Sequence, residues 1–79
     1  MSYVICVKDK VLGKSIEMSV EPDTKVEDIL VNSADYLGKR PGVYMIKFGS
    51  KILPGDMTVS EAGVKRCDLL EILPDPQGG

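Results

Sequence analysis

Hydrophobic residues in this sequence follow strand-like spacing near both ends and helical spacing only once, between them. Residues 3–8 (YVICVK) are rich in β-branched side chains, and residues 16–20 (IEMSV) alternate apolar with polar side chains, as half-buried strands do. Residues 9–13 (DKVLG) have the composition of a turn, and Gly13 can adopt a positive φ. The first twenty residues therefore predict a β-hairpin, whose first strand points these side chains to one face: Tyr3, Ile5 and Val7.

A helix is predicted after this hairpin. Residues 24–27 (TKVE) have the spacing of a capping box, in which the Thr24 hydroxyl accepts a hydrogen bond from the Glu27 N–H. Gly38 and Pro41 are typical of the end of a helix. Between them the apolar residues recur at roughly helical spacing, which predicts about three turns packed across the sheet: Val26, Ile29, Leu30 and Leu37.

Two more strands are predicted next. Residues 43–48 (VYMIKF) should form a strand, and residues 51–53 (KIL) a very short one stopped by Pro54-Gly55. In the longer strand we expect Tyr44, Ile46 and Phe48 to face inward, and Met45 and Lys47 to face outward.

The last part of the chain predicts a short helix and a final strand. Residues 58–61 (TVSE) repeat the capping-box spacing for one helical turn that Gly63 ends. Residues 69–73 (LLEIL), ended by Pro74, are apolar on both faces, which suits a central position beside the first strand. The order of these elements predicts an α+β fold with a mixed sheet.

Composition limits the classes of function. The chain has 79 residues and a formal net charge of −2, which indicates one domain and gives no reason to expect a nucleic-acid partner. The basic doublets Lys39-Arg40 and Lys65-Arg66 are interpreted as solvated surface charge. No segment reaches the ~20 apolar residues of a membrane helix, so we expect no membrane partner.

Catalytic residue types are scarce. Histidine is absent, and Cys6 and Cys67 are the only cysteines, which we interpret as reduced thiols of a cytoplasmic or nuclear protein. Without histidine, neither a zinc site nor an activated thiol is favoured. We therefore expect no enzyme activity, no metal and no cofactor.

In their order and spacing, these segments resemble the ubiquitin-like family over nearly the whole chain. The resemblance is carried by residues 13–22, 24–29, 48–53 and 58–61, then by Val64, Leu70, Ile72 and the final Gly78-Gly79. It implies a β-grasp domain over residues 1–73 and a flexible conjugation tail over residues 74–79.

The resemblance also implies a protein modifier that acts through its C-terminal glycines, Gly78 and Gly79. In that family an activating enzyme adenylates the terminal carboxylate with ATP, an enzyme cysteine takes it as a thioester, and a target lysine accepts it. The residues suit this chemistry, because glycine has no Cβ to obstruct a narrow channel, and Pro74 and Pro76 favour an extended segment. The implied partners are activating and conjugating enzymes and target proteins, and we expect a monomer.

The sequence departs from ubiquitin in its binding surface and tail. Lys47 and Glu71 fall where ubiquitin presents an isoleucine and a histidine, so receptors for ubiquitin should bind poorly. Asp75 replaces a basic residue, which favours a dedicated activating enzyme. The predicted partner-binding surface combines Lys47 and Glu71 with Met45, Leu73 and one of Val11 or Leu12. Lys14 and Lys51 align with lysines that ubiquitin uses for chains, so they are candidate chain acceptors.

Two alternatives share this fold. In a sulfur carrier the adenylated carboxylate becomes a thiocarboxylate, and the Gly78-Gly79 pair is the same. In a non-covalent interaction module the two glycines have no chemical role.

Overall fold

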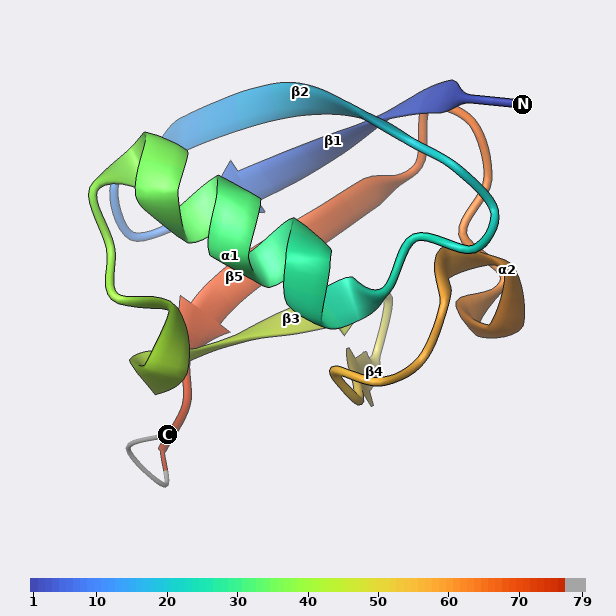
Figure 1. Ribbon diagram of the computed structural model, residues 1–79. Helices are drawn as coiled ribbons and strands as arrows, with labels where there is room; N and C mark the ends of the chain where they lie inside the picture. Colours follow the sequence, from blue (N-terminus) through green and yellow to red (C-terminus); the bar gives the residue numbers. More distant parts are fainter. Residues whose placement is uncertain (77–79) are drawn as a thin grey trace.

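The computed structural model describes residues 1–76, which form a five-stranded mixed sheet with one main helix packed across it (Figure 1). The elements, in chain order, are β1 (Tyr3–Asp9), β2 (Lys14–Val20), α1 (Val26–Leu37), the 3₁₀ turn η1 (Pro41–Val43), β3 (Tyr44–Phe48), β4 (Lys51–Leu53), α2 (Val59–Ala62) and β5 (Leu69–Pro74). The strand order is β2-β1-β5-β3-β4. This arrangement is consistent with a β-grasp fold and confirms the predicted α+β class.

The last strand is central, as its apolar composition predicted. β5 runs parallel to β1, with Val7 opposite Leu70, and antiparallel to β3, with Ile46 opposite Ile72. Figure 1 shows β5 between these two strands, beneath α1. The edge strands are β2, the second strand of the N-terminal hairpin, and the short β4.

The core lies between the sheet and α1. Alternate residues of β1, β5 and β3 are buried, because successive side chains of a strand point to opposite faces. On the helix, Val26, Ile29 and Ala34 are buried against them, and Tyr44 and Phe48 are partly buried beside Ile46. The buried apolar residues of the strands are Ile5, Val7, Val20, Ile46, Leu53, Leu70 and Ile72. The predicted inward faces of the first and third strands are thus confirmed.

The two predicted capping boxes have different outcomes. At α2 the box is confirmed: the Thr58 hydroxyl accepts from the Glu61 N–H at 3.1 Å, and the Glu61 carboxylate accepts from the Thr58 N–H at 2.9 Å. At α1 the prediction was wrong. The N-cap is Lys25, without a side-chain cap, and the Thr24 hydroxyl accepts from the Glu21 N–H at 2.9 Å.

The reason is tertiary. The first N–H groups of α1 donate to carbonyls of the loop before α2: Val26 to Met57 at 2.8 Å, and Glu27 to Gly55 at 2.9 Å. Because these carbonyls already satisfy the free helix donors, a side-chain cap is not needed. The C-terminal end of α1 is as predicted, with Gly38 at φ 73°.

Candidate functional site

The face of the sheet opposite α1 carries the predicted partner-binding residues. Strand pairing sets Lys8, Glu71 and Lys47 side by side on β1, β5 and β3; we call these three residues the charged row. Ser15 of β2 and Ile52 of β4 extend it to both edges of the sheet. The predicted residues Lys47 and Glu71 are therefore direct cross-strand neighbours.

The charged row lies between two apolar pairs on the same face. On one side Met45 of β3 stands opposite Leu73 of β5. On the other side Cys6 of β1 stands opposite Leu69, which is 47% exposed. The structure thus brings together four of the predicted partner-binding residues, Met45, Lys47, Glu71 and Leu73, and adds Leu69 to their surroundings.

Glu71 is the electrostatic centre of this face. The Lys10 ammonium lies 2.9 Å from its carboxylate, whose side chain is 17% exposed. The hydrogen bond from Lys10 holds the pKa of Glu71 below its ordinary value, and the charges of Lys47 and Lys8 lower it further, while burial opposes the shift. Glu71 is therefore an anion at neutral pH. Lys10 forms an ion pair with it, and Lys8 and Lys47 are its cross-strand neighbours.

Val11 and Leu12 lie apart from the charged row and the two apolar pairs, in the turn between β1 and β2. Their backbone N–H groups donate to the Asp9 Oδ1 atom, at 2.9 Å and 3.2 Å. Their side chains remain outside the core, 79% and 49% exposed. Strand register therefore places neither of them beside Lys47, and the choice between them stays open.

Lys39 and Asp9 form a buried ion pair that the sequence did not predict. The Lys39 Nζ lies 2.7 Å from Asp9 Oδ2, and the two side chains are 11% and 2% exposed. This close contact with the Lys39 ammonium lowers the pKa of Asp9, and the Asp9 carboxylate in turn raises the pKa of Lys39. The interpretation of Lys39 as solvated charge was wrong, because Asp9 draws its ammonium inward; Arg40 is exposed, as expected.

The ion pair adjoins the start of the C-terminal segment. The Lys39 ammonium lies 4.6 Å from the ring centroid of Tyr44, within cation–π distance. Tyr44 pairs with Pro74 at the end of β5, and the Asp75 N–H donates to the Val43 carbonyl at 2.9 Å. The ladder thus continues to Asp75, and Pro76 follows it. Gly78 and Gly79 lie outside the described residues.

The sequence pattern did indicate that Asp9 faces inward, but residues 9–13 were assigned to a turn. Asp9 continues the period-two series of Ile5 and Val7, whose side chains point into the core. An aspartate is also a common turn residue because its carboxylate accepts nearby N–H groups, and here Oδ1 does so. One carboxylate therefore shapes the turn with one oxygen and binds Lys39 with the other.

The remaining candidate residues are on the surface. Lys14 begins β2 and Lys51 begins β4, and both are exposed, as a chain acceptor must be. Cys6 and Cys67 are free thiols. Within residues 1–76, no three His, Cys, Asp or Glu side chains gather as metal ligands would.

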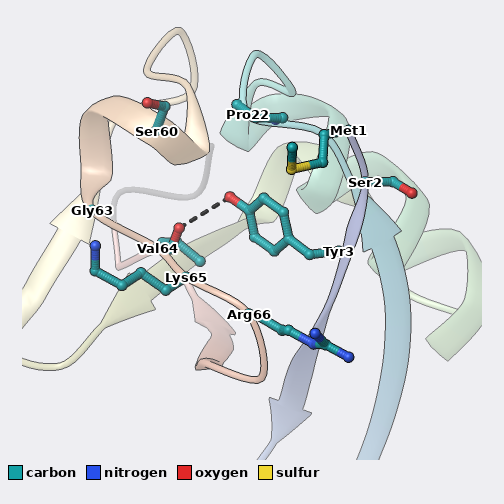
Figure 2. Close-up of a pocket in the computed structure, with 9 residues that line it drawn as sticks. All are labelled: Met1, Ser2, Tyr3, Pro22, Ser60, Gly63, Val64, Lys65 and Arg66. Carbon is teal, nitrogen blue, oxygen red and sulfur yellow. Dashed lines mark hydrogen bonds between the residues drawn. The ribbon is translucent and has the colours of Figure 1, made fainter.

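A surface depression lies between the N-terminus and the α2–β5 loop (Figure 2). Its floor contains the Tyr3 ring, whose hydroxyl donates to the Val64 carbonyl at 3.0 Å. The basic side chains at its rim, Lys65 and Arg66, extend in different directions in Figure 2.

Comparison with known proteins adds no family assignment. No protein-family model matches this chain, and no curated protein matches it at a significant level. Among the described residues, the helices are all too short or too polar to span a bilayer.

Proposed function

We propose that this chain is a ubiquitin-like protein modifier, joined through Gly79 to lysine amines of target proteins. The main support is the position of β5, the last strand of the sheet in chain order. β5 is a central strand with Leu70 and Ile72 buried in the core, and it ends at Pro74. The Asp75 N–H, which donates to the Val43 carbonyl, extends this anchoring by one residue. Conjugation through Gly79 would thus attach a target to a rigid part of the domain.

The chemistry requires an activated carboxylate. The free Gly79 carboxylate is a poor electrophile, so ATP would convert it to an acyl-adenylate with release of pyrophosphate. A thiolate of the activating enzyme would displace AMP to form a thioester, and a target amine would then displace the thiolate. In this scheme the modifier supplies no catalytic side chain.

The proposed partners are a dedicated activating enzyme, a conjugating enzyme and the target proteins, in the cytoplasm or nucleus. The charged row supports a dedicated set of partners. It places Lys8, which is exposed, and Lys47, which is half-buried, on the outer face beside Glu71, where a partner with an apolar pocket would have to desolvate charge at a cost. Lys14 and Lys51 are proposed as acceptors if chains form.

Conjugation is tested with N-terminally tagged protein expressed in its native host. Met1 is 99% exposed, so a tag there leaves the core undisturbed. Heavier tagged species that survive denaturation should be present with the unaltered chain and absent with Gly79→Ala. Gly42→Ala is a matched control, because a Cβ at Gly42 would meet no atom within 4 Å.

The intact mass of the free protein separates the alternatives. Replacement of one oxygen by sulfur at the C-terminus would indicate a sulfur carrier. Unchanged mass, with no adducts and no effect of Gly79→Ala, would indicate a non-covalent module. Either result would contradict the proposed conjugation.

A further inference from the structure

We infer that the outer face of the sheet is a docking surface for an acidic segment of a partner protein, which the charged row binds through Lys8 and Lys47. This inference does not depend on the chemistry of Gly79, because it concerns the unconjugated domain. It adds the chemical class of the partner to a surface whose position alone was predicted.

The first argument is the state of the three lysines around Glu71. Lys10 forms a 2.9 Å ion pair with Glu71, whereas Lys8 and Lys47 act on Glu71 only through their charges. Within residues 1–76, Lys8 and Lys47 form no such pair. These two ammonium groups therefore have unused capacity to bind carboxylates, although the protein as a whole is negatively charged.

The second argument is geometry. Lys8 and Lys47 stand on either side of β5 in one row, so their Cα atoms are about two strand spacings, or roughly 10 Å, apart. Glu71 between them would repel a carboxylate at the centre. The surface therefore favours two acidic groups that straddle the row over a single acidic group above it.

The third argument is the apolar surface beside the row. Leu69 and Val4 are 47% and 42% exposed, and Ile52 at the far edge is 49% exposed. Exposed apolar side chains next to unpaired charges are typical of a binding surface with a mixed interface. The partner segment should therefore combine carboxylates with at least one apolar side chain.

The main helix is not an alternative site for an acidic segment. α1 carries Glu27, Asp28 and Asp35 and has no basic residue, so an acidic segment would be repelled there. Glu17, opposite Cys6 on β2, limits the favourable region at one edge. Within the sheet and α1, the charged row is thus where an acidic segment meets unpaired cations.

The test measures the binding of three short capped peptides to the full chain. Binding is followed by NMR, through the changes in the chemical shifts of the protein's backbone amides. The first peptide carries two glutamates on either side of a leucine; in the second and third the glutamates are glutamine or lysine. We expect the glutamate peptide to shift the amides of Lys8, Lys47, Leu69 and Glu71, and added salt to weaken binding because it screens exposed charges.

Variants locate the interaction. Lys47→Glu should weaken binding by about tenfold and Lys47→Gln by roughly threefold, as expected when a rim charge is reversed or removed. Lys65→Glu makes the same charge change in the α2–β5 loop and should leave affinity unchanged. Lys47→Gln keeps the test valid if the new glutamate beside Glu71 disturbs the sheet.

Three outcomes would overturn the inference. The glutamine or lysine peptide could bind as well as the glutamate peptide. The shifts could fall on α1 or on the depression near Tyr3. The outer-face amides could shift with protein concentration alone, which would mean that a second copy covers this face. None of these results bears on whether Gly79 is conjugated.

Discussion

The Asp9 carboxylate and the Lys39 ammonium lie 2.7 Å apart with little access to solvent. Asp9 is the last residue of β1, and Lys39 lies between α1 and η1. The pair therefore joins two positions that are 30 residues apart in the sequence. Removing one partner of a buried pair leaves an uncompensated charge, which costs more than the pair contributes. The following predictions begin with this contact.

Replacement of Lys39 by methionine should destabilise the domain. The methionine retains an apolar stem but leaves Asp9 without its cation, so the free energy of unfolding should fall clearly. Urea denaturation measures this. Arg40→Met, at the exposed neighbouring position, should change stability by less than about 0.5 kcal/mol. Equal losses for the two variants would contradict the contribution assigned to the ion pair.

Stability should decrease in acid, partly through Asp9. Lys39 holds the pKa of folded Asp9 below its ordinary value, so the unfolded chain binds more protons between the two pKa values. The stabilisation is therefore complete above about pH 4, the unfolded pKa, and is lost as pH falls through the folded pKa. Glu61 and Glu71, whose pKa values are also lowered, act in the same direction.

The Asp9→Asn variant isolates its share of this effect. Asparagine can still accept the turn N–H groups through its carbonyl oxygen but has no proton to gain. The free energy of unfolding, measured across the acid range, should therefore depend less steeply on pH than in the unaltered chain. An identical acid dependence would show that Asp9 is not a source of the loss.

The two threonines of the capping-box patterns should differ in importance. Thr58→Ala removes a helix cap and should cost about 1 kcal/mol. The Thr24 hydroxyl accepts the Glu21 N–H at an exposed position and caps no helix, so Thr24→Ala should cost less, about 0.5 kcal/mol. Thermal or urea unfolding of both variants provides the comparison, and a larger loss at Thr24 would contradict the observed capping.

Gly63 should be less replaceable than Gly42. Gly63 ends α2 at φ 76°, and a side chain in that region costs about 1–2 kcal/mol. Gly42 does not have a positive φ, and a Cβ there meets no atom within 4 Å. Gly63→Ala should therefore lower the midpoint of unfolding while Gly42→Ala leaves it nearly unchanged; equal midpoints would contradict this.

Much of the fold follows from local patterns in the sequence. Period-two alternation identified the inward residues of β1 and β3, and the apolar run of residues 69–73 identified a central strand. What local patterns could not predict were contacts made across the fold. The carbonyls of Gly55 and Met57 replace the expected Thr24 cap, and Asp9 recruits a lysine from the segment after α1.

The candidate site also has a part that local patterns predicted and a part that they did not. Outward placement of Met45 and Lys47 followed from strand alternation, but their pairing with Leu73 and Glu71 depended on register between β3 and β5. The ion pair of Lys10 with Glu71 needed β1 and β5 to be neighbours. No periodicity within one segment contains this information, because it arises only when strands far apart in the sequence are paired.

The most direct test of the proposed function is a branched peptide. Arg66 is the last basic residue of the chain, so trypsin would leave residues 67–79 attached to a target lysine. Mass spectrometry of denatured extracts from the native host should find these residues joined from the Gly79 carbonyl to a lysine Nζ, and should lose them with Gly79→Ala but not with Gly42→Ala. If the free chain is abundant and no such peptide is found, the domain is not a modifier.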